Sequence, residues 1–323
     1  MKYIFGPVNS RRLGRSLGVD LFTEKICTLN CIYCEVGPTA QLTCKRGKYT
    51  PTEEIVAELD AFFSGPDNRA DIDTVTVTAS GEPTLHVDLG KILSFLRTLA
   101  PPRIALLTNG TTFDDPQVRQ EVACADVVIP SLDSALPASF RKIDRPAGCL
   151  ELARVIEGLV TFSLEFTGQL WLEILFARGI NDSDDDVSAL AEVMARMRLD
   201  RIQINTVARP PLESFAQPLA ESRLREIGCF FQNRFADVPV DLLAQGAPTA
   251  DEGGGRQHVE PVDDRLAEII EMLRRRPCTA ADINKTFHLG GPEKVEQSLA
   301  PFVRSGQLRL RQYGDRKYYQ IQE

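Results

Sequence analysis

The chain has 323 residues, of which 43% are hydrophobic and 25% are charged, and its net charge is −8. This length predicts a soluble protein with one large domain and one smaller domain. We find no secretory leader and no apolar run of about 18 residues, so we expect a cytoplasmic protein with no membrane partner, and the acidic balance argues against a protein devoted to coating nucleic acid.

Short apolar or β-branched segments alternate with amphipathic helical patterns over the first 245 residues. Six successive strand-and-helix units predict an α/β fold with a parallel sheet and right-handed crossovers, either doubly wound or rolled toward a barrel. The predicted strands are 17–22, 74–79, 103–108, 126–132, 170–176 and 201–207.

Two helix starts between these strands carry capping signals. Thr50 is placed to cap a helix that has Pro51 in its first turn and Glu53 as the reciprocal partner. Gly65 marks the end of that helix. Ser183 precedes three acidic residues, which favour the positive end of a helix dipole. Both signals support the alternation of strands with helices.

Polar and small residues cluster directly after each predicted strand. Because the carboxyl ends of parallel strands lie at one edge of a sheet, we expect these loops to meet at a single mouth. The loops are 26–37, 80–86, 109–112, 131–134, 177–183 and 208–211.

Three cysteines, Cys27, Cys31 and Cys34, fall within eight residues. In a reducing compartment cysteines are more often metal ligands, catalytic thiols or buried small hydrophobes than disulfides. Structural zinc sites use four ligands, and the other five cysteines lie far apart. In a cubane iron–sulfur cluster each thiolate binds one iron, so three thiolates leave the fourth iron open to a small molecule. The alternative is a set of three buried, unligated cysteines.

The spacing CxxxC followed by any residue, an aromatic residue and cysteine is completed by Tyr33. At these residues the chain resembles the radical S-adenosylmethionine (SAM) superfamily, and the resemblance covers residues 5–245. It implies a partial (β/α)6 TIM-type barrel and a 4Fe–4S cluster on the three cysteines. It also implies reductive cleavage of SAM into methionine and a 5′-deoxyadenosyl radical that abstracts hydrogen from a substrate.

The resemblance further implies a set of SAM contacts. Residues 80–83, Ser-Gly-Glu-Pro, are similar to the Gly-Gly-Glu-Pro element that meets the SAM amino group. Glycine allows a close backbone approach, and a carboxylate suits an ammonium. We expect Tyr33 and the backbone near Val207 to lie by the adenine. The residues expected to contact SAM are Tyr33, Ser80, Gly81, Glu82, Pro83, Asn109, Ser131, Asp133 and Val207.

Two further residues leave alternatives open. Glu173 is a charge in the middle of a predicted strand, and we expect it to pair either with SAM or with a structural arginine. Cys44 lies beside Lys45 and Arg46, which favour a thiolate. It is either a reactive thiol, the one candidate catalytic residue, or an incidental loop cysteine.

The segments FGPVNSRRLGRSLGVDL (5–21), RKIDRP, RGIND and ARPP resemble, more loosely, the radical SAM enzymes of wybutosine synthesis on tRNA. Those enzymes carry a second cluster on additional N-terminal cysteines, and no cysteine precedes Cys27 here. The tRNA reaction and its need for pyruvate are therefore not carried over.

The composition changes near residue 245. Residues 245–261 are rich in Gly, Pro and small polar residues, which predicts a linker between a core domain at 1–244 and a second domain at 262–323. Three helical patterns followed by a hairpin predict that this second domain is a small α+β winged helix. Its net charge of +2 is low for reading duplex DNA. The predicted wing carries Arg309, Arg311, Arg316 and Lys317.

Two classes of function follow from these observations. The first is a radical SAM oxidoreductase or transferase that acts on an RNA, a peptide or a small molecule, with an electron donor such as flavodoxin or ferredoxin. The second is a regulator whose cluster senses redox state and whose winged helix binds nucleic acid. Because a sensor has no need of SAM-binding loops after three strands, the sequence favours the enzyme.

Overall fold

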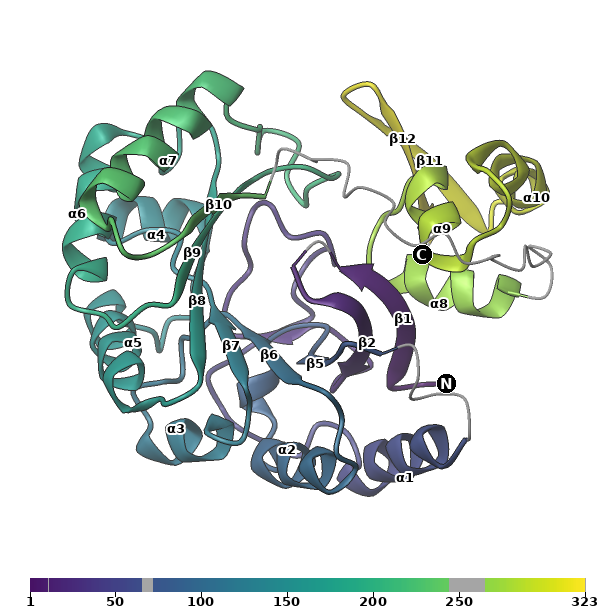
Figure 1. Cartoon of the computed structure of the whole chain (residues 1–323). Coiled ribbons are helices and arrows are strands. Elements are labelled where there is room, and N and C mark those ends of the chain that lie inside the picture. Colours follow the sequence, from purple (N-terminus) through teal and green to yellow (C-terminus); the bar gives the residue numbers. More distant parts are fainter. Residues whose placement is uncertain (11, 66–71, 244–264, 323) are drawn as a thin grey trace.

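The computed structural model describes residues 1–10, 12–65, 72–243 and 265–322. An eight-stranded sheet curls into an open barrel whose outer face is covered by helices (Figure 1). The strand order β1-β2-β5-β6-β7-β8-β9-β10 follows the chain, so the sheet winds in one direction only. A doubly wound sheet reverses its order at a switch point. The partial TIM-type barrel is therefore confirmed, and the doubly wound alternative was wrong.

The barrel strands are β1 (Ile4–Ser10), β2 (Gly14–Asp20), β5 (Thr74–Thr78), β6 (Ile104–Thr108), β7 (Val127–Pro130), β8 (Gln169–Phe176), β9 (Arg201–Thr206) and β10 (Val240–Leu242). The outer helices are α1 (Thr52–Ser64), α2 (Leu89–Thr98), α3 (Pro116–Val122), α4 (Pro137–Ile143), α5 (Leu152–Glu165), α6 (Asp184–Met194) and α7 (Glu221–Arg234). At the mouth lie the short strands β3 (Ile26–Cys27) and β4 (Gln41–Leu42) and the 3-10 helix η1 (Pro83–Leu85).

All six predicted strands form, and the two edge strands are additions. β1 pairs antiparallel with β2, and β10 pairs parallel with β9. Gly6 and Pro7 interrupt the apolar pattern of β1, which suits an edge position but hides a strand. β10 has only three residues, too few for a periodic signal.

The predicted helix ends are only partly correct. Ser183 caps α6 by accepting a hydrogen bond from the Asp186 N–H at 3.1 Å, and Gly65 follows the last residue of α1, both as expected. Thr50 does not cap α1. Its hydroxyl donates instead to the Leu21 carbonyl at 2.6 Å, because the chain enters α1 across the end of β2, where that carbonyl is buried.

Apolar side chains form separate layers outside and inside the barrel. The main core fills the space between the sheet and the helices, with Leu17, Val19 and Leu59 fully buried. A smaller cluster inside the barrel includes Leu13 and Trp171, which lie near the amino ends of the strands. This inner cluster closes the end opposite the mouth, so polar groups are accessible at the carboxyl ends of the strands.

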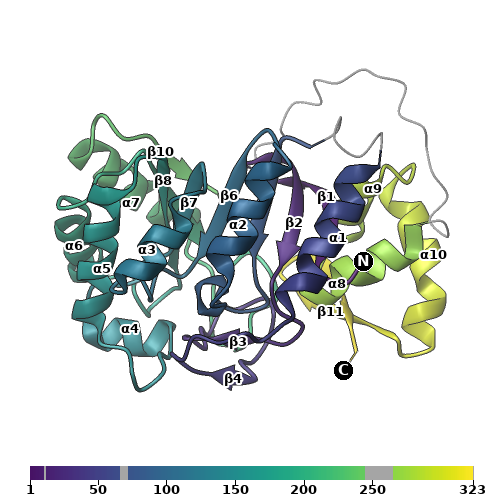
Figure 2. The same cartoon turned by 90° about the horizontal axis from the view of Figure 1, so that it is seen from below.

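Residues 265–322 form three helices and a hairpin beside the open side of the barrel, next to β1 (Figures 1 and 2). This order of elements agrees with the predicted winged helix, whose role stays a prediction; the predicted linker at 245–261 lies outside the described residues. Within the described ranges no helix is long and apolar enough to cross a bilayer. The elements are α8 (Leu266–Arg275), α9 (Ala280–Phe287), α10 (Pro292–Arg304), β11 (Leu308–Tyr313) and β12 (Arg316–Ile321).

Candidate functional site

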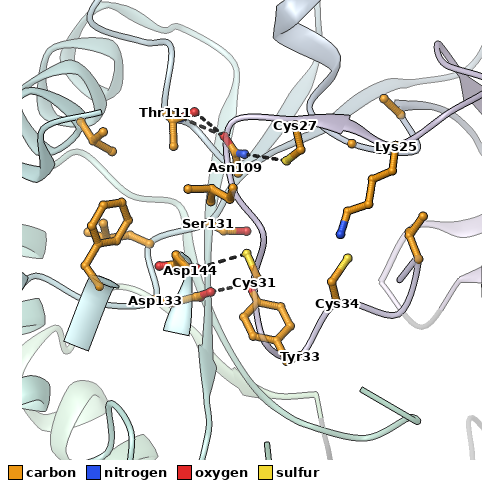
Figure 3. A pocket seen from close by; sticks show the side chains of 17 residues that line it. Lys25, Cys27, Cys31, Tyr33, Cys34, Asn109, Thr111, Ser131, Asp133 and Asp144 are labelled. Atoms are coloured by element: carbon orange, nitrogen blue, oxygen red, sulfur yellow. Dashed lines mark hydrogen bonds between the residues drawn. The ribbon is translucent and has the colours of Figure 1, made fainter. Parts of the chain in front are cut away.

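A cavity opens at the carboxyl ends of the barrel strands, and the loops after β2, β5, β6 and β7 line it (Figure 3). Cys27, Cys31 and Cys34 all face this cavity, and all three are free thiols. The sequence prediction that these loops meet at one mouth is therefore correct for the cysteine segment and for three of the later loops.

The three cysteines fit a cubane cluster by their chemistry. Among the described residues no three His, Cys, Asp or Glu side chains converge as the ligands of a single ion do. A cubane cluster does not require such convergence, because each thiolate binds a different iron. Burial, with the Glu82 carboxylate as a second cause, raises the pKa of Cys27 to about 12. Binding iron must therefore expel protons from buried thiols.

Two cysteine sulfurs have polar neighbours that the sequence did not reveal. The Asn109 amide donates to Cys27 Sγ at 3.5 Å (Figure 3), and it also donates to the Thr28 hydroxyl at 2.8 Å. Cys31 Sγ donates to Asp144 Oδ1 at 3.3 Å. Hydrogen bonds to ligand sulfurs are one determinant of a cluster's reduction potential, so Asn109 is placed to affect it. Asp144 belongs to the RKIDRP segment, whose only signal in the sequence was its resemblance to a branch of the superfamily.

Tyr33 and Asp133 line the cavity together. The Tyr33 hydroxyl donates to the Asp133 carboxylate, whose other oxygen accepts the Leu175 N–H at 2.8 Å. Burial raises the pKa of Asp133 to about 6, and burial together with Asp133 raises that of Asp144. Ser131 lies on the same wall. Three of the residues expected to contact SAM, Tyr33, Ser131 and Asp133, thus share one wall, although Asp133 is already hydrogen-bonded within the protein.

The position of Glu82 corrects the sequence-based expectation for this residue. Its carboxylate is fully buried, does not line the cavity, and accepts hydrogen bonds from Thr84, Thr108 and the Asn109 N–H. One of these bonds caps η1. In this geometry Glu82 joins the loops after β5 and β6, and it does not present its charge to a SAM ammonium.

The Ser-Gly-Glu-Pro loop presents its backbone to the cavity, and not the Glu82 carboxylate. Gly81 lines it with φ +137°, and a Cβ there would lie 1.8 Å from the Ile26 carbonyl oxygen. Only glycine allows this close approach. Ser80 is held by Asp20, which accepts both its N–H and its hydroxyl at 2.7 Å. Pro83 is buried at the start of η1, where it packs rather than faces the cavity.

Glu173 and Val207 do not line this cavity. Glu173 forms an ion pair with Arg12, which also donates to Gln203 Oε1 at 2.8 Å. Of the two partners that the sequence left open, the structure therefore provides the structural arginine. Val207 follows β9 as predicted, but its side chain is buried in an apolar cluster with Ile32.

Cys44 is not a free thiol. It forms a disulfide with Cys149, with the two Cα atoms 6.4 Å apart. This pairing corrects both the candidate catalytic thiol and the expectation that the cysteines stay unpaired. The two residues are 105 positions apart, so their proximity follows from the loops at the mouth and has no signal in the sequence. The bond ties the segment after β4 to the connection between α4 and α5.

Comparisons with known proteins agree with these features. A family model described as the radical SAM superfamily matches residues 23–191. A "UPF0026 protein" of Helicobacter pylori is 31% identical over 86% of this chain and 86% of its own length. A "GTPase Obg" of Brachyspira hyodysenteriae is 30% identical over 95% of this chain, which spans only 43% of that protein. Among solved structures, TYW1 with a lysine-pyruvate adduct has a TM-score of 0.52 at 17% identity, covering 68% of this chain and 73% of that one.

Proposed function

Because the chain belongs to the radical SAM superfamily, we propose that Cys27, Cys31 and Cys34 each bind one iron of its 4Fe–4S cluster. Members of the superfamily are enzymes that bind such a cluster and SAM. When bound and reduced, the cluster supplies the electron that cleaves SAM to methionine and a 5′-deoxyadenosyl radical. A one-electron donor such as flavodoxin or ferredoxin reduces it in this proposal. The regulator alternative has no support in the proteins compared above.

The residues of this chain orient SAM from two sides of the cavity. The backbone of Gly81 meets the amino group, because Gly81 brings the chain to the cavity surface and its carbonyl is an acceptor for an ammonium, whereas the Ser80 carbonyl already accepts the Ile26 N–H at 3.1 Å. Glu82 supports this loop from behind through its bond to the Asn109 N–H at 2.6 Å. Ser131 on the opposite wall accepts or donates to the ribose.

We infer that the substrate is anionic and enters between the barrel mouth and the C-terminal hairpin. This inference rests on one face of the hairpin, which bears Tyr313, Tyr318, Arg311 and Arg316. Arg311 lies directly opposite Tyr318, and Arg316 opposite Tyr313, so the four side chains share one face.

Two contacts turn this hairpin face toward the barrel. The Tyr318 hydroxyl donates to the Ala208 carbonyl at 3.0 Å, and Tyr313 packs against the cluster that contains Ile32 and Val207. In the part of the chain that the structure describes, neither Arg311 nor Arg316 forms an ion pair with a carboxylate. Two cations near the mouth without acidic partners favour an anionic ligand.

The loop after β9 adds to this rim. Phe215 is 53% exposed, and the Arg145 guanidinium lies 5.9 Å from its ring centroid. Arg145 is itself paired with Glu213 at 2.5 Å, so what this loop adds to the rim is an exposed aromatic ring, a group on which nucleic acid bases stack. We therefore favour a phosphate-bearing substrate, an RNA or a nucleotide, over a neutral peptide.

The activity test is anaerobic. The reconstituted protein with dithionite and SAM is expected to form 5′-deoxyadenosine, and a protein that loads its cluster but forms none would overturn the proposal. For the substrate class, we expect a fluorescein-labelled single-stranded RNA oligonucleotide to bind with an affinity that falls as salt rises from about 50 to 200 mM. In the double variant Arg311→Gln with Arg316→Gln, the slope of log affinity against log salt concentration should become shallower by about 0.7 for each phosphate contact that is lost.

A matched pair of charge removals on α10, Lys294→Gln with Arg304→Gln, serves as the control. Both residues are exposed and lie away from the barrel-facing side of the hairpin. This control should bind the oligonucleotide with the salt dependence of the wild type. Inorganic triphosphate, added as a competitor, distinguishes a nucleotide from an RNA as the bound ligand. Competition at low millimolar concentration indicates a nucleotide site. Equal salt dependence in both double variants would rule out the hairpin as the anion site.

A further inference from the structure

The last residue of α8, Arg275, extends from the C-terminal domain into the open side of the barrel. Its guanidinium lies 4.6 Å from the Phe5 ring centroid and donates to the Lys2 carbonyl at 3.1 Å. Its Nε lies 3.4 Å from Asp20 Oδ2. The Arg275 side chain is 13% exposed and that of Asp20 is 6% exposed, so this ion pair is largely shielded from water. It joins residues 255 positions apart in the sequence.

Glycine at position 18 of β2 makes room for the Phe5 ring over which Arg275 lies. Leu17 and Val19 are buried in the main core against the helices, so Gly18 and Asp20 alternate onto the inner face of the strand. A Cβ on Gly18 would lie 2.1 Å from the Phe5 ring. The far end of the Phe5 ring therefore occupies the space beside Gly18, and Arg275 stacks over the ring.

Asp20 connects Arg275 to the loop proposed to hold SAM. Its Oδ1 accepts the Ser80 N–H at 2.7 Å, and its Oδ2 accepts the Ser80 hydroxyl at 2.7 Å. Oδ1 also accepts the Phe22 N–H at 3.2 Å. The carboxylate that contacts the Arg275 cation is thus the same group that fixes the backbone of Ser80 before Gly81.

A buried carboxylate is stabilised both by hydrogen-bond donors and by a cation close to it. Within the described residues Arg275 is the cationic side chain that lies within 4 Å of Asp20. The Arg275 Nε makes no directed hydrogen bond, although it is buried. The contact with Asp20 is therefore mainly electrostatic, whereas the directed hydrogen bonds of the Arg275 guanidinium go to the Glu271 carbonyl at 2.9 Å and the Lys2 carbonyl at 3.1 Å.

We propose that Arg275 is a positioning residue for SAM. By pairing with Asp20, it holds that carboxylate in the position that accepts both bonds from Ser80, and so it orders the loop on which SAM is bound. The inference rests on the proposed function in one respect, the assignment of the Gly81 backbone, directly after Ser80, to the SAM amino group. Its consequence is that docking of the C-terminal domain and binding of SAM are thermodynamically linked, and the linkage is reciprocal.

The test measures SAM affinity by equilibrium dialysis in the full-length, cluster-loaded protein under anaerobic, non-reducing conditions, so that no turnover occurs. Arg275→Gln removes the charge and is expected to weaken SAM binding about 5- to 150-fold. Arg275→Lys keeps the charge and should restore most of the affinity. As a control, Asn9→Ala removes a different interdomain hydrogen bond, from Asn9 Nδ2 to the Lys285 carbonyl at 2.8 Å, and should leave SAM affinity unchanged.

A second readout separates positioning from simple stabilisation. Both Arg275→Gln and Asn9→Ala loosen the domain contact, but only the first should raise the dissociation constant for SAM. SAM should also protect the C-terminal domain of the wild type from limited proteolysis, and this protection should be lost in Arg275→Gln. If Arg275→Gln binds SAM as tightly as the wild type, the proposal is wrong, whatever its melting temperature.

A double variant keeps the proposal testable if Arg275→Gln does not fold. Asp20→Asn removes the charge that needs a partner while keeping an oxygen for Ser80, so adding it to Arg275→Gln should restore folding. Failure of the double variant to fold would show that the charge pair is not the cause. Wild-type protein that loads its cluster but binds no SAM would refute the proposed function itself. A wild type that binds SAM normally, with Arg275→Gln unchanged, would refute only the linkage.

Discussion

Glu82→Gln separates a structural role for this carboxylate from direct contact with SAM. Glu82 Oε1 accepts the Thr84 N–H at 3.0 Å, the Thr84 hydroxyl at 2.6 Å and the Thr108 hydroxyl at 2.6 Å. Oε2 accepts the Asn109 N–H at 2.6 Å. A glutamine has only one oxygen, so its amide NH2 must point at a donor on one side or the other.

The favoured orientation keeps three bonds at the amide oxygen and places the NH2 against the Asn109 N–H. A buried N–H without an acceptor costs about 1–3 kcal/mol, and each bond that changes from charged to neutral loses about 1 kcal/mol. Burial raises the pKa of Glu82, so the ionised group carries a desolvation cost that the variant no longer has. The free energy of unfolding should therefore fall by about 2–4 kcal/mol.

The assay is urea unfolding followed by the fluorescence of Trp171, the single tryptophan of the chain, which is 8% exposed inside the barrel. Glu192→Gln, at an exposed position on α6, is the matched control and should change stability by less than about 0.5 kcal/mol. SAM affinity of Glu82→Gln should fall because the loops after β5 and β6 separate. A variant as stable as the wild type that has nevertheless lost SAM affinity would show direct contact with SAM and refute this reasoning.

Three further outcomes are expected. Cys31→Ala should abolish the brown absorbance near 400 nm of the reconstituted protein, whereas Cys229→Ala, at an exposed free thiol, should retain it; loss in both would contradict the three-ligand assignment. Cys149→Ser should lower the unfolding free energy of oxidised protein by about 4–5 kcal/mol and leave reduced protein unchanged, since the bond to Cys44 closes a long loop. Burial lowers the pKa of His86, so the unfolded state binds protons more readily; wild-type stability should fall more steeply than that of His86→Gln as pH drops below about 6.5, and equal slopes would contradict this.

The six inner strands and the cysteine site were predictable because their signals are local. A strand of four to eight apolar residues and three cysteines within eight positions depend only on near neighbours in the chain. Once the strands are parallel, their carboxyl ends must share one edge, so the meeting of Cys27, Gly81, Asn109 and Ser131 in one cavity also followed. The sequence did not predict the two edge strands, because Gly6 and Pro7 interrupt the apolar pattern of β1 and because β10 is too short to show an alternating pattern.

Contacts between distant segments needed the folded chain. The sequence showed that Glu173 required a partner, but only the fold brings Arg12, 161 positions away, into the barrel beside it. It showed eight cysteines, but not that Cys44 and Cys149 lie together.

The orientation of a single side chain was equally hidden. Because Glu82 follows a predicted strand, the sequence predicted that its carboxylate lies at the mouth. In the structure the carboxylate instead points into the protein, where it accepts hydrogen bonds from four donors on two loops.

The relation between the two domains is the clearest case. The sequence predicted a core domain and a second domain joined by a linker, and it gave no sign of a contact between them. The tertiary structure instead places Arg275 against Asp20 inside the barrel. Periodicity and spacing specify elements and their order because those signals are short-ranged. The partner of a buried charge is decided by which surfaces the completed fold brings together, and here that partner belongs to the other domain.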